Sequence, residues 1–268
     1  MNIIGKIAVN VFRESVRDKV LYNLVAFATL LIAVSYLLGQ LTAGQDVKII
    51  KDLGLAAIAT FGLLIAVFIG IGLVWKEVER RSIYSLLSKP IRRYEFILGK
   101  YAGLALTLLV NVAIMTAAFY AVLAYMNTQF TESARAAWPA PATDVGMLRA
   151  IALIFFELLL VTAIALFFST FSSPFLSAAL TFGLWVIGHF NADLRNFETV
   201  VESRTAARLA RGLYYVLPNF AAFDIKTQVV HALPVPGSYL AVTAAYAASY
   251  IALLLAGSVV IFSRRDFK

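Results

Sequence analysis

The chain has 268 residues, 61% of them hydrophobic and 14% charged; soluble domains average about 45–50% apolar and about 25% charged residues, so an ordinary soluble domain is excluded. Its pI is near 9.7, but the basic residues lie beside apolar runs rather than on one polar face, which argues against nucleic-acid binding. With no cysteine and two histidines, the sequence excludes disulfides and thiolate metal sites, and we expect no bound metal or other cofactor.

The first 19 residues have the pattern of an amphipathic helix at the membrane surface. Lys6, Arg13 and Arg17 can face lipid headgroups on one side of this helix. The other side is apolar and is formed by Ile3, Ile4, Ile7, Val11 and Phe12. The alternative is a plain cytosolic extension of the first membrane span.

Six apolar runs are long enough to cross a bilayer, which takes about 20 helical residues. They cover residues 20–41, 53–75, 101–126, 148–171, 174–190 and 239–262. The fifth run is the shortest. No cleavable signal precedes the first run, so we expect it to remain as a membrane anchor. The sequence therefore predicts an all-α integral membrane protein with six transmembrane helices in one domain, residues 1–268.

Between the second and third runs lies a charged segment, residues 75–100, which holds seven of the 23 Lys and Arg residues. Ile83, Leu86 and Leu87 keep a short apolar stripe at helical spacing within it. We expect a compact, basic, partly helical loop where a cytosolic partner can bind. Glu77 and Glu79 lie near the arginines that follow them, and a solvated ion-pair network is the expected role of these charges.

The distribution of positive charge predicts the orientation. Residues 1–19, 76–100 and 263–268 together hold 14 of the 23 Lys and Arg residues. Basic residues close to span ends favour the cytoplasmic side. We therefore expect both termini in the cytoplasm of a multi-pass protein of the inner (plasma) membrane, in agreement with an even number of spans.

The outer stretch 191–238 is too long and too patterned for a plain loop. Residues 197–213 have a helical alternation of polar and apolar side chains, and the stretch ends at Pro234, Val235, Pro236 and Gly237. We expect one or two short re-entrant helices on or in the outer leaflet between spans five and six.

Glu157 is the only carboxylate well inside a predicted span. A charge at that depth costs several kcal/mol, so such a residue usually faces a cavity or a polar partner. Asn111 and Thr107 in the third run are the expected partners, and His189 lies nearer the outer end of the fifth. Two interpretations stay open: a carboxylate that contacts substrate or protons, and a structural hydrogen-bonding residue between helices.

Small residues recur at four-residue spacing in three runs, which lets helix backbones approach closely in lipid. The three sets are Gly62, Ala66 and Gly70; Gly99 and Gly103; and Ala241, Ala245 and Ser249. This spacing predicts a packed bundle or dimer and carries no chemistry.

Several enzyme motifs are missing from the sequence. It contains no G-x-x-x-x-G-K-[ST] phosphate loop, no G-x-S-x-G and no H-E-x-x-H. We therefore expect no catalytic residue and no nucleotide bound by this chain.

The charged segment resembles the first cytosolic loop of ABC transporter permeases of the type-2 exporter family. The resemblance is carried there by Glu77, Ser82, Leu86, Leu87, Pro90, Arg93, Gly99 and Lys100. It continues in Tyr215-x-x-Pro218-Asn219-Phe220 and in Phe262-Ser263-Arg264-Arg265-Asp266-Phe267. With the six runs and the amphipathic N-terminus it covers essentially the whole chain, and it looks closest to the small permeases grouped with copper-site maturation and gliding motility.

The resemblance implies a permease homodimer driven by two separate cytosolic ATPase subunits, which bind ATP and Mg. The family's coupling helix would correspond to residues 81–89. Ile83, Leu86 and Leu87 would enter a groove on the ATPase, with Arg81 and Lys89 among the cations that orient it. Pro90 would stop this helix. The family often has Gly-Thr where this chain has Arg81-Ser82.

The resemblance also implies that the first and fifth spans line the dimer interface and that the outer re-entrant helices close the exit. Three alternative hypotheses for the function remain. The first is a secondary transporter that uses Glu157 as a proton relay, and the second is a conformational transmitter to a periplasmic or cell-surface partner that moves no solute. The third, an intramembrane enzyme, is disfavoured by the missing motifs.

Overall fold

The computed structural model describes residues 3–40, 46–79, 92–136, 138, 141–190, 211–212 and 214–264. Within these ranges the secondary structure is helical, and they contain no β-strand. The predicted coupling helix, residues 81–89, lies outside the described residues. So do residues 191–210 of the predicted outer stretch.

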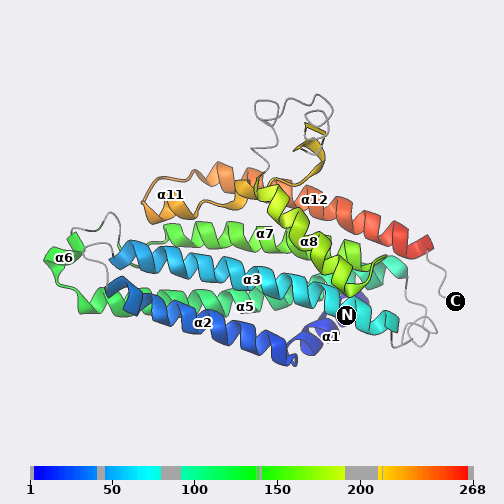
Figure 1. Cartoon of the computed structure of the whole chain (residues 1–268), viewed down its shortest axis with the longest axis horizontal. Coiled ribbons are helices and arrows are strands. Elements are labelled where there is room, and N and C mark those ends of the chain that lie inside the picture. Colours follow the sequence, from blue (N-terminus) through cyan, green and yellow to red (C-terminus); the bar gives the residue numbers. More distant parts are fainter. Residues whose placement is uncertain are drawn as a thin grey trace.

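Five helices of the described chain are long and apolar enough to cross a membrane. They are α2 (Lys19–Gln40), α3 (Asp46–Glu79), α5 (Arg93–Gln129), α7 (Gly146–Ser169) and α12 (Gly237–Arg264). They lie side by side in one bundle (Figure 1). These helices confirm five of the expected spans. Both α3 and α5 begin several residues before the predicted runs. Hydropathy identifies only the apolar part of a helix, whereas the helical hydrogen bonds continue into the polar residues that flank it.

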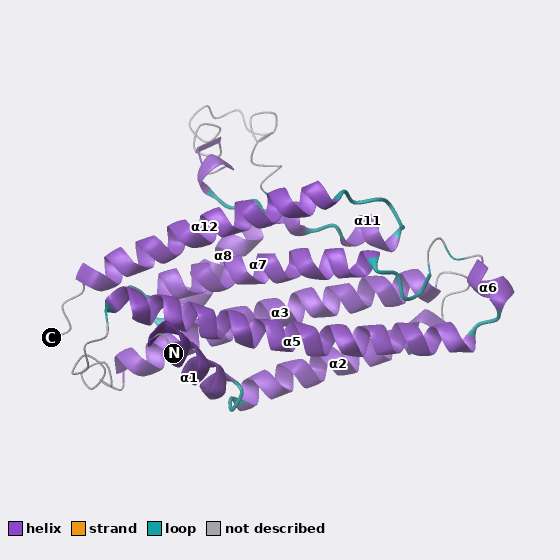
Figure 2. Cartoon of the chain, turned by 180° about the vertical axis from the view of Figure 1, so that it is seen from behind, coloured by secondary structure: helices purple, strands orange, loops and turns teal. Residues whose placement is uncertain are grey.

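Both ends of the described chain lie at the same end of the bundle (Figures 1 and 2). We call this the terminal end; α3 ends and α5 begins here. The opposite, distal end holds the short helix α6 (Glu132–Ala136), the start of α7 and the start of α12. The predicted location of both termini on one side of the membrane is compatible with this arrangement.

The fifth predicted span is the 16-residue helix α8 (Pro174–His189). The Ser173 hydroxyl accepts a hydrogen bond from Leu176 N, and Pro174 occupies the first turn, so the start of α8 is well specified. A helix of this length rises about 24 Å, less than the roughly 30 Å hydrocarbon thickness. It crosses the other helices obliquely (Figure 1). Length alone therefore does not make α8 a sixth spanning helix.

The N-terminal helix α1 (Ile3–Ser15) packs against the start of α5. A Cβ atom added at Gly99 would lie 2.7 Å from Ile7 Cβ, and one at Gly103 would lie 2.6 Å from both Val11 Cβ and the Ala8 carbonyl oxygen. The glycines therefore permit the close approach that their spacing predicts. The apolar side of α1 contacts protein here.

The core of the bundle is built around α3 and α7. A Cβ at Gly62 would lie 2.5 Å from a methyl group of Leu158, and one at Gly70 would lie 3.1 Å from Ala165 Cβ. This confirms close packing at the first small-residue set, which contains Gly62 and Gly70. The third set is different, because Ala241, Ala245 and Ser249 on α12 are exposed in the single chain.

The described residues between α8 and α12 include the 3₁₀ helix η2 (Phe220–Phe223) and the short helix α11 (Lys226–Val230). η2 contacts α7 and α8, and α11 contacts α3 and α7. Their apolar residues Phe220, Phe223, Val229 and Val230 are buried. The described part of the predicted outer stretch therefore contains short helices, and their apolar side chains pack on the bundle.

Candidate functional site

The predicted coupling helix is flanked by two helix ends that the structure does describe. The backbone of α3 is helical through Glu77 to Glu79, and α5 begins at Arg93. The other proposed coupling residues lie outside the described chain: Arg81, Ser82, Ile83, Leu86, Leu87, Lys89 and Pro90. The described part of this region is therefore the pair of flanking helices at the terminal end.

The start of α5 is hydrogen-bonded to the end of α12. Arg93 Nη1 donates to the carbonyl oxygens of Phe262 at 2.7 Å and Ser263 at 2.8 Å. Carbonyls in the last turn of a helix lack partners within the helix, and a cationic donor satisfies them well. The rings of Phe96 and Phe262 stack beside this contact, with centroids 5.5 Å apart and planes 15° apart. The two helix ends are therefore joined by polar and aromatic contacts.

The same turns of α5 also form a small apolar core with α1, α7 and α12. We call it the terminal cluster; its buried residues are Val11, Phe96, Ile97, Leu104, Leu166, Leu255 and Phe262. Lys100 is fully buried here, with its Nζ 5.1 Å from the centroid of the Phe96 ring, within cation–π range. The residues that directly follow the predicted coupling helix thus pack on three other helices.

Glu157 is buried between α7 and α8. Trp185 Nε1 donates a hydrogen bond to Glu157 Oε1 at 2.7 Å, and His189 Nε2 lies 3.8 Å from the same oxygen. His189 Nδ1 lies 3.1 Å from the carbonyl oxygen of Trp185. A carbonyl oxygen only accepts, so Nδ1 carries the hydrogen of that contact and Nε2 faces the carboxyl group. The 3.8 Å separation from His189 is longer than a hydrogen bond, so Trp185 is the hydrogen-bond partner of Glu157.

The expected pairing of Glu157 with the third span is wrong. Asn111 is buried, but its Nδ2 donates to the Thr107 carbonyl oxygen at 2.7 Å within α5. The Thr107 hydroxyl donates to Gly103 O at 2.9 Å in the same helix. These polar groups satisfy one another locally, and α8 supplies the partners of Glu157 instead.

The end of α8 is covered by the chain that leads into η2. The rings of His189 and Phe220 stack with centroids 5.8 Å apart and planes 12° apart. A Cβ at Gly188 would lie 2.6 Å from the Pro218 carbonyl oxygen. Only glycine therefore lets the chain at Pro218 pass this close to α8.

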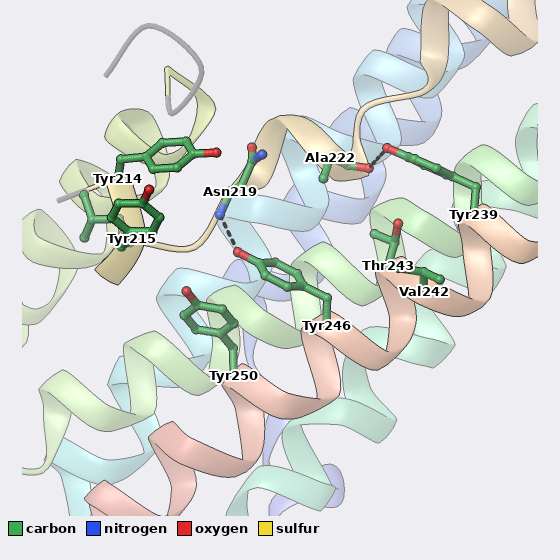
Figure 3. A pocket seen from close by; sticks show the side chains of 10 residues that line it. Tyr214, Tyr215, Asn219, Ala222, Tyr239, Val242, Thr243, Tyr246 and Tyr250 are labelled. Atoms are coloured by element: carbon green, nitrogen blue, oxygen red, sulfur yellow. Dashed lines mark hydrogen bonds between the residues drawn. The ribbon is translucent and has the colours of Figure 1, made fainter. Parts of the chain in front are cut away.

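A second feature of the structure is a pocket between residues 214–222 and α12, with a volume of about 440 Å³. We call it the tyrosine pocket, because tyrosines make up five of its ten lining residues: Tyr214, Tyr215, Tyr239, Tyr246 and Tyr250. Figure 3 shows Tyr246 and Tyr250 projecting from α12 toward the chain that carries Tyr214, Tyr215 and Asn219. Its volume is within the range of about 300–1,000 Å³ that is usual for small-molecule sites.

Two hydrogen bonds shape this pocket. The backbone N–H of Asn219 donates to the Tyr246 hydroxyl at 2.8 Å, and the Tyr239 hydroxyl donates to Ala222 O at 2.7 Å (Figure 3). The side-chain oxygen Oδ1 of Asn219 is buried and has no hydrogen-bond partner among the described residues. A buried acceptor without a partner is unusual in proteins and requires an explanation.

Sequence reasoning missed the tyrosine pocket. The available signal is the 4-3-4 spacing of Tyr239, Thr243, Tyr246 and Tyr250, which places four hydroxyl-bearing residues on one side of a helix. Within the described residues, no group of three or more His, Cys, Asp or Glu side chains could hold a metal ion.

The comparisons with known proteins fit this architecture. The family model described as "ABC-2 family transporter protein" matches residues 6–267, nearly the whole chain. No curated protein matches the chain. The family comprises multi-pass membrane components of ABC transporters, which agrees with the apolar helical bundle. The chain therefore belongs to the ABC-2 family of transporter proteins.

Proposed function

We propose that this chain is the membrane subunit of an ATP-driven exporter, working as a homodimer with two separate cytosolic ATPase subunits. The observation that carries the proposal is the family match over residues 6–267. Six crossings would result if α8, together with the chain after it, returned the polypeptide to the distal side. The terminal end would then face the cytoplasm of a cell with an inner (plasma) membrane.

The chain's role would be mechanical. ATP and Mg would bind to the partner ATPase, and closure of the ATPase pair would move the coupling helix at residues 81–89. That motion would reach the bundle through the start of α5. Arg93 binds the last carbonyls of α12, and Gly99 and Gly103 touch α1. A displaced α5 would therefore carry α12 and α1 with it, in a two-state scheme that nucleotide biases.

The homodimer is supported by exposed apolar faces on α2 and α8, which both pack against α3. Phe27 and Leu37 on α2 and Phe175 on α8 are large, apolar and exposed in the single chain. A second copy or membrane lipid would cover them. We place the dimer interface on these two helices, with lipid on the remaining exposed surface.

The experiment is to introduce a charge into the apolar stripe of the coupling helix. Leu86→Asp and Leu87→Asp should each lower the ATPase activity of the assembled complex about tenfold or more, because a carboxylate in an apolar groove is costly. Leu233→Asp is the matched control, since Leu233 is exposed near the distal end. Unchanged assembly and ATPase activity in both coupling variants would reject the docking role.

A proton-coupled secondary transporter is the second candidate, and the buried Glu157–His189 contact favours it. It predicts that Glu157→Gln abolishes transport and that no ATPase co-purifies with the tagged chain. A third form of the proposal is a transmitter of conformational change to a periplasmic or cell-surface partner. Co-purification from the native membrane separates the three, because each predicts a different companion.

A further inference from the structure

The exposed side of α1, together with the turn after it, carries a row of basic residues. Lys6, Arg13 and Arg17 are exposed, and their spacing of seven and then four residues places them on one side of a helix. Arg17 lies just after α1, where Val16 N still donates to Phe12 O at 2.9 Å, so the helical path continues. Among the described residues, none is hydrogen-bonded or ion-paired with these three side chains. We call them the basic row.

Two carboxylates lie near the basic row in the sequence. Glu14 is exposed, and at about 3.6 residues per turn it lies between the row and the side of α1 that packs on α5. Asp18 Oδ1 accepts a hydrogen bond from Val20 N at 3.0 Å, at the start of α2. Because Lys19 follows the row, residues 3–19 hold four basic and two acidic side chains. This surface therefore keeps a net positive charge.

An apolar flank borders the basic row. Val9, Phe12 and Val16 share the next side of the helix and are half-buried. In Figure 2, α1 lies at the terminal end, and α2 follows it. Val20 and Tyr22 of α2 are exposed at the start of the first apolar span. A basic side next to an apolar side, where a span begins, is typical of a helix at the level of the lipid headgroups.

Lys and Arg bind phosphate oxygens through charge-assisted hydrogen bonds. We propose that the basic row binds the phosphate groups of anionic phospholipids in the leaflet at the terminal end, with their acyl chains against Val9, Phe12 and Val16. A lipid is preferred to an acidic soluble protein because the row borders this apolar flank and the first residues of a membrane span. The opposite side of α1 packs on Gly99 and Gly103, so bound lipid would also fix the depth of these turns of α5. This site does not depend on coupling to an ATPase.

The test is lipid retention by the full-length chain, measured by native mass spectrometry from micelles that contain equal amounts of phosphatidylglycerol and phosphatidylcholine. Phosphatidylglycerol should be retained preferentially. The double variant Arg13→Gln/Arg17→Gln should reduce this preference about tenfold or more, since each basic residue near an anionic surface contributes roughly fivefold. The matched control is Arg92→Gln/Arg264→Gln, which removes two exposed arginines from the same end of the bundle but from other helices. The control should reduce the preference less.

A charge-conserving variant separates binding from folding. Arg13→Lys/Arg17→Lys should keep most of the preference for phosphatidylglycerol, because the positive charges remain at the same positions. Equal retention of the two lipids by the unchanged chain, or equal losses in the two glutamine variants, would overturn the proposal. Displacement of phosphatidylglycerol by millimolar inorganic phosphate would replace the lipid with a soluble anion. An unchanged lipid preference in Arg13→Gln/Arg17→Gln, together with loss of a co-purifying protein, would assign the row to a protein contact instead.

Discussion

Arg93 Nη1 lies 2.7 Å from the carbonyl oxygen of Phe262, although 169 residues separate them in the chain. The contact joins the first residue of α5 to the last turn of α12, directly after the predicted coupling helix. A displacement of that segment would reach the final helix through this contact and the neighbouring stack of Phe96 on Phe262. Its strength can be measured.

Arg93→Ala should lower the free energy of unfolding by about 1–2 kcal/mol, because it leaves two helix-end carbonyls without this charged donor. It should also weaken the stimulation of ATPase activity in the assembled complex. Thermal unfolding of the purified chain and ATPase assays give the two readouts. The control is Arg92→Ala, since Arg92 is exposed and its guanidinium contacts Tyr94 at 3.4 Å. Equal effects of both substitutions would contradict the proposed role of Arg93.

Gly103→Ala should destabilise the protein by about 1–3 kcal/mol, the usual cost of overpacking. The added methyl group would lie 2.6 Å from the backbone oxygen of Ala8, which cannot move without shifting α1. Gly72→Ala is a matched control on α3. A methyl group added at Gly72 would have no neighbouring atom within 4 Å apart from the backbone of its own helix. We expect that control to be neutral or stabilising by up to about 1 kcal/mol. The measurement is thermal unfolding in one detergent, and similar midpoints for the two variants would reject the close contact of α1 with α5.

Trp185→Phe should destabilise the contact between α7 and α8 by about 1–3 kcal/mol, since it removes the donor to a buried carboxyl oxygen. Glu157→Gln keeps an acceptor for Trp185 and should cost less. Trp138→Phe tests the general effect of losing an indole, because Trp138 packs edge-to-face on Phe130. Unfolding midpoints that rank Trp138→Phe as the most damaging would count against the Glu157 assignment.

Ala232→Gly should raise stability by about 0.5–1 kcal/mol. Ala232 has a φ of 58°, and it follows α11 in a turn where Leu233 N donates to Gln228 O at 2.8 Å. Glycine adopts this left-handed conformation without the clash that a methyl group causes. Ala221→Gly in η2 provides the comparison and should instead lose about 0.5–1 kcal/mol. A lower midpoint for Ala232→Gly than for the unchanged chain would contradict the prediction.

The sequence pattern predicted the positions of the helices well, but it predicted the contacts between helices less well. Apolar length identified five long helices, and glycines at four-residue spacing identified the contacts at Gly62 and Gly103. The same spacing at Ala241 and Ala245 marks an exposed face. Small residues allow another helix to approach closely, but their spacing does not show whether another helix packs on that surface.

The partners of Glu157 show the same limit for polar contacts. Asn111 lies at a similar depth and is the reasonable choice from sequence, but it satisfies Thr107 within its own helix. Which helix lies against α7 depends on packing over long sequence distances. The tyrosine pocket is hidden for the same reason, because the spacing on α12 is visible in the sequence while its meeting with Asn219 is not.

The length of α3 has a consequence for how a soluble partner reaches this protein. Its apolar run ends at Trp75, but the helix backbone continues to Glu79. Four further residues add about 6 Å, comparable to the thickness of one headgroup layer of a bilayer. A 34-residue helix is about 51 Å long, so a tilt of about 10° would swing its tip by about 9 Å. A small tilt of α3 would therefore move its end by a distance comparable to the diameter of a helix.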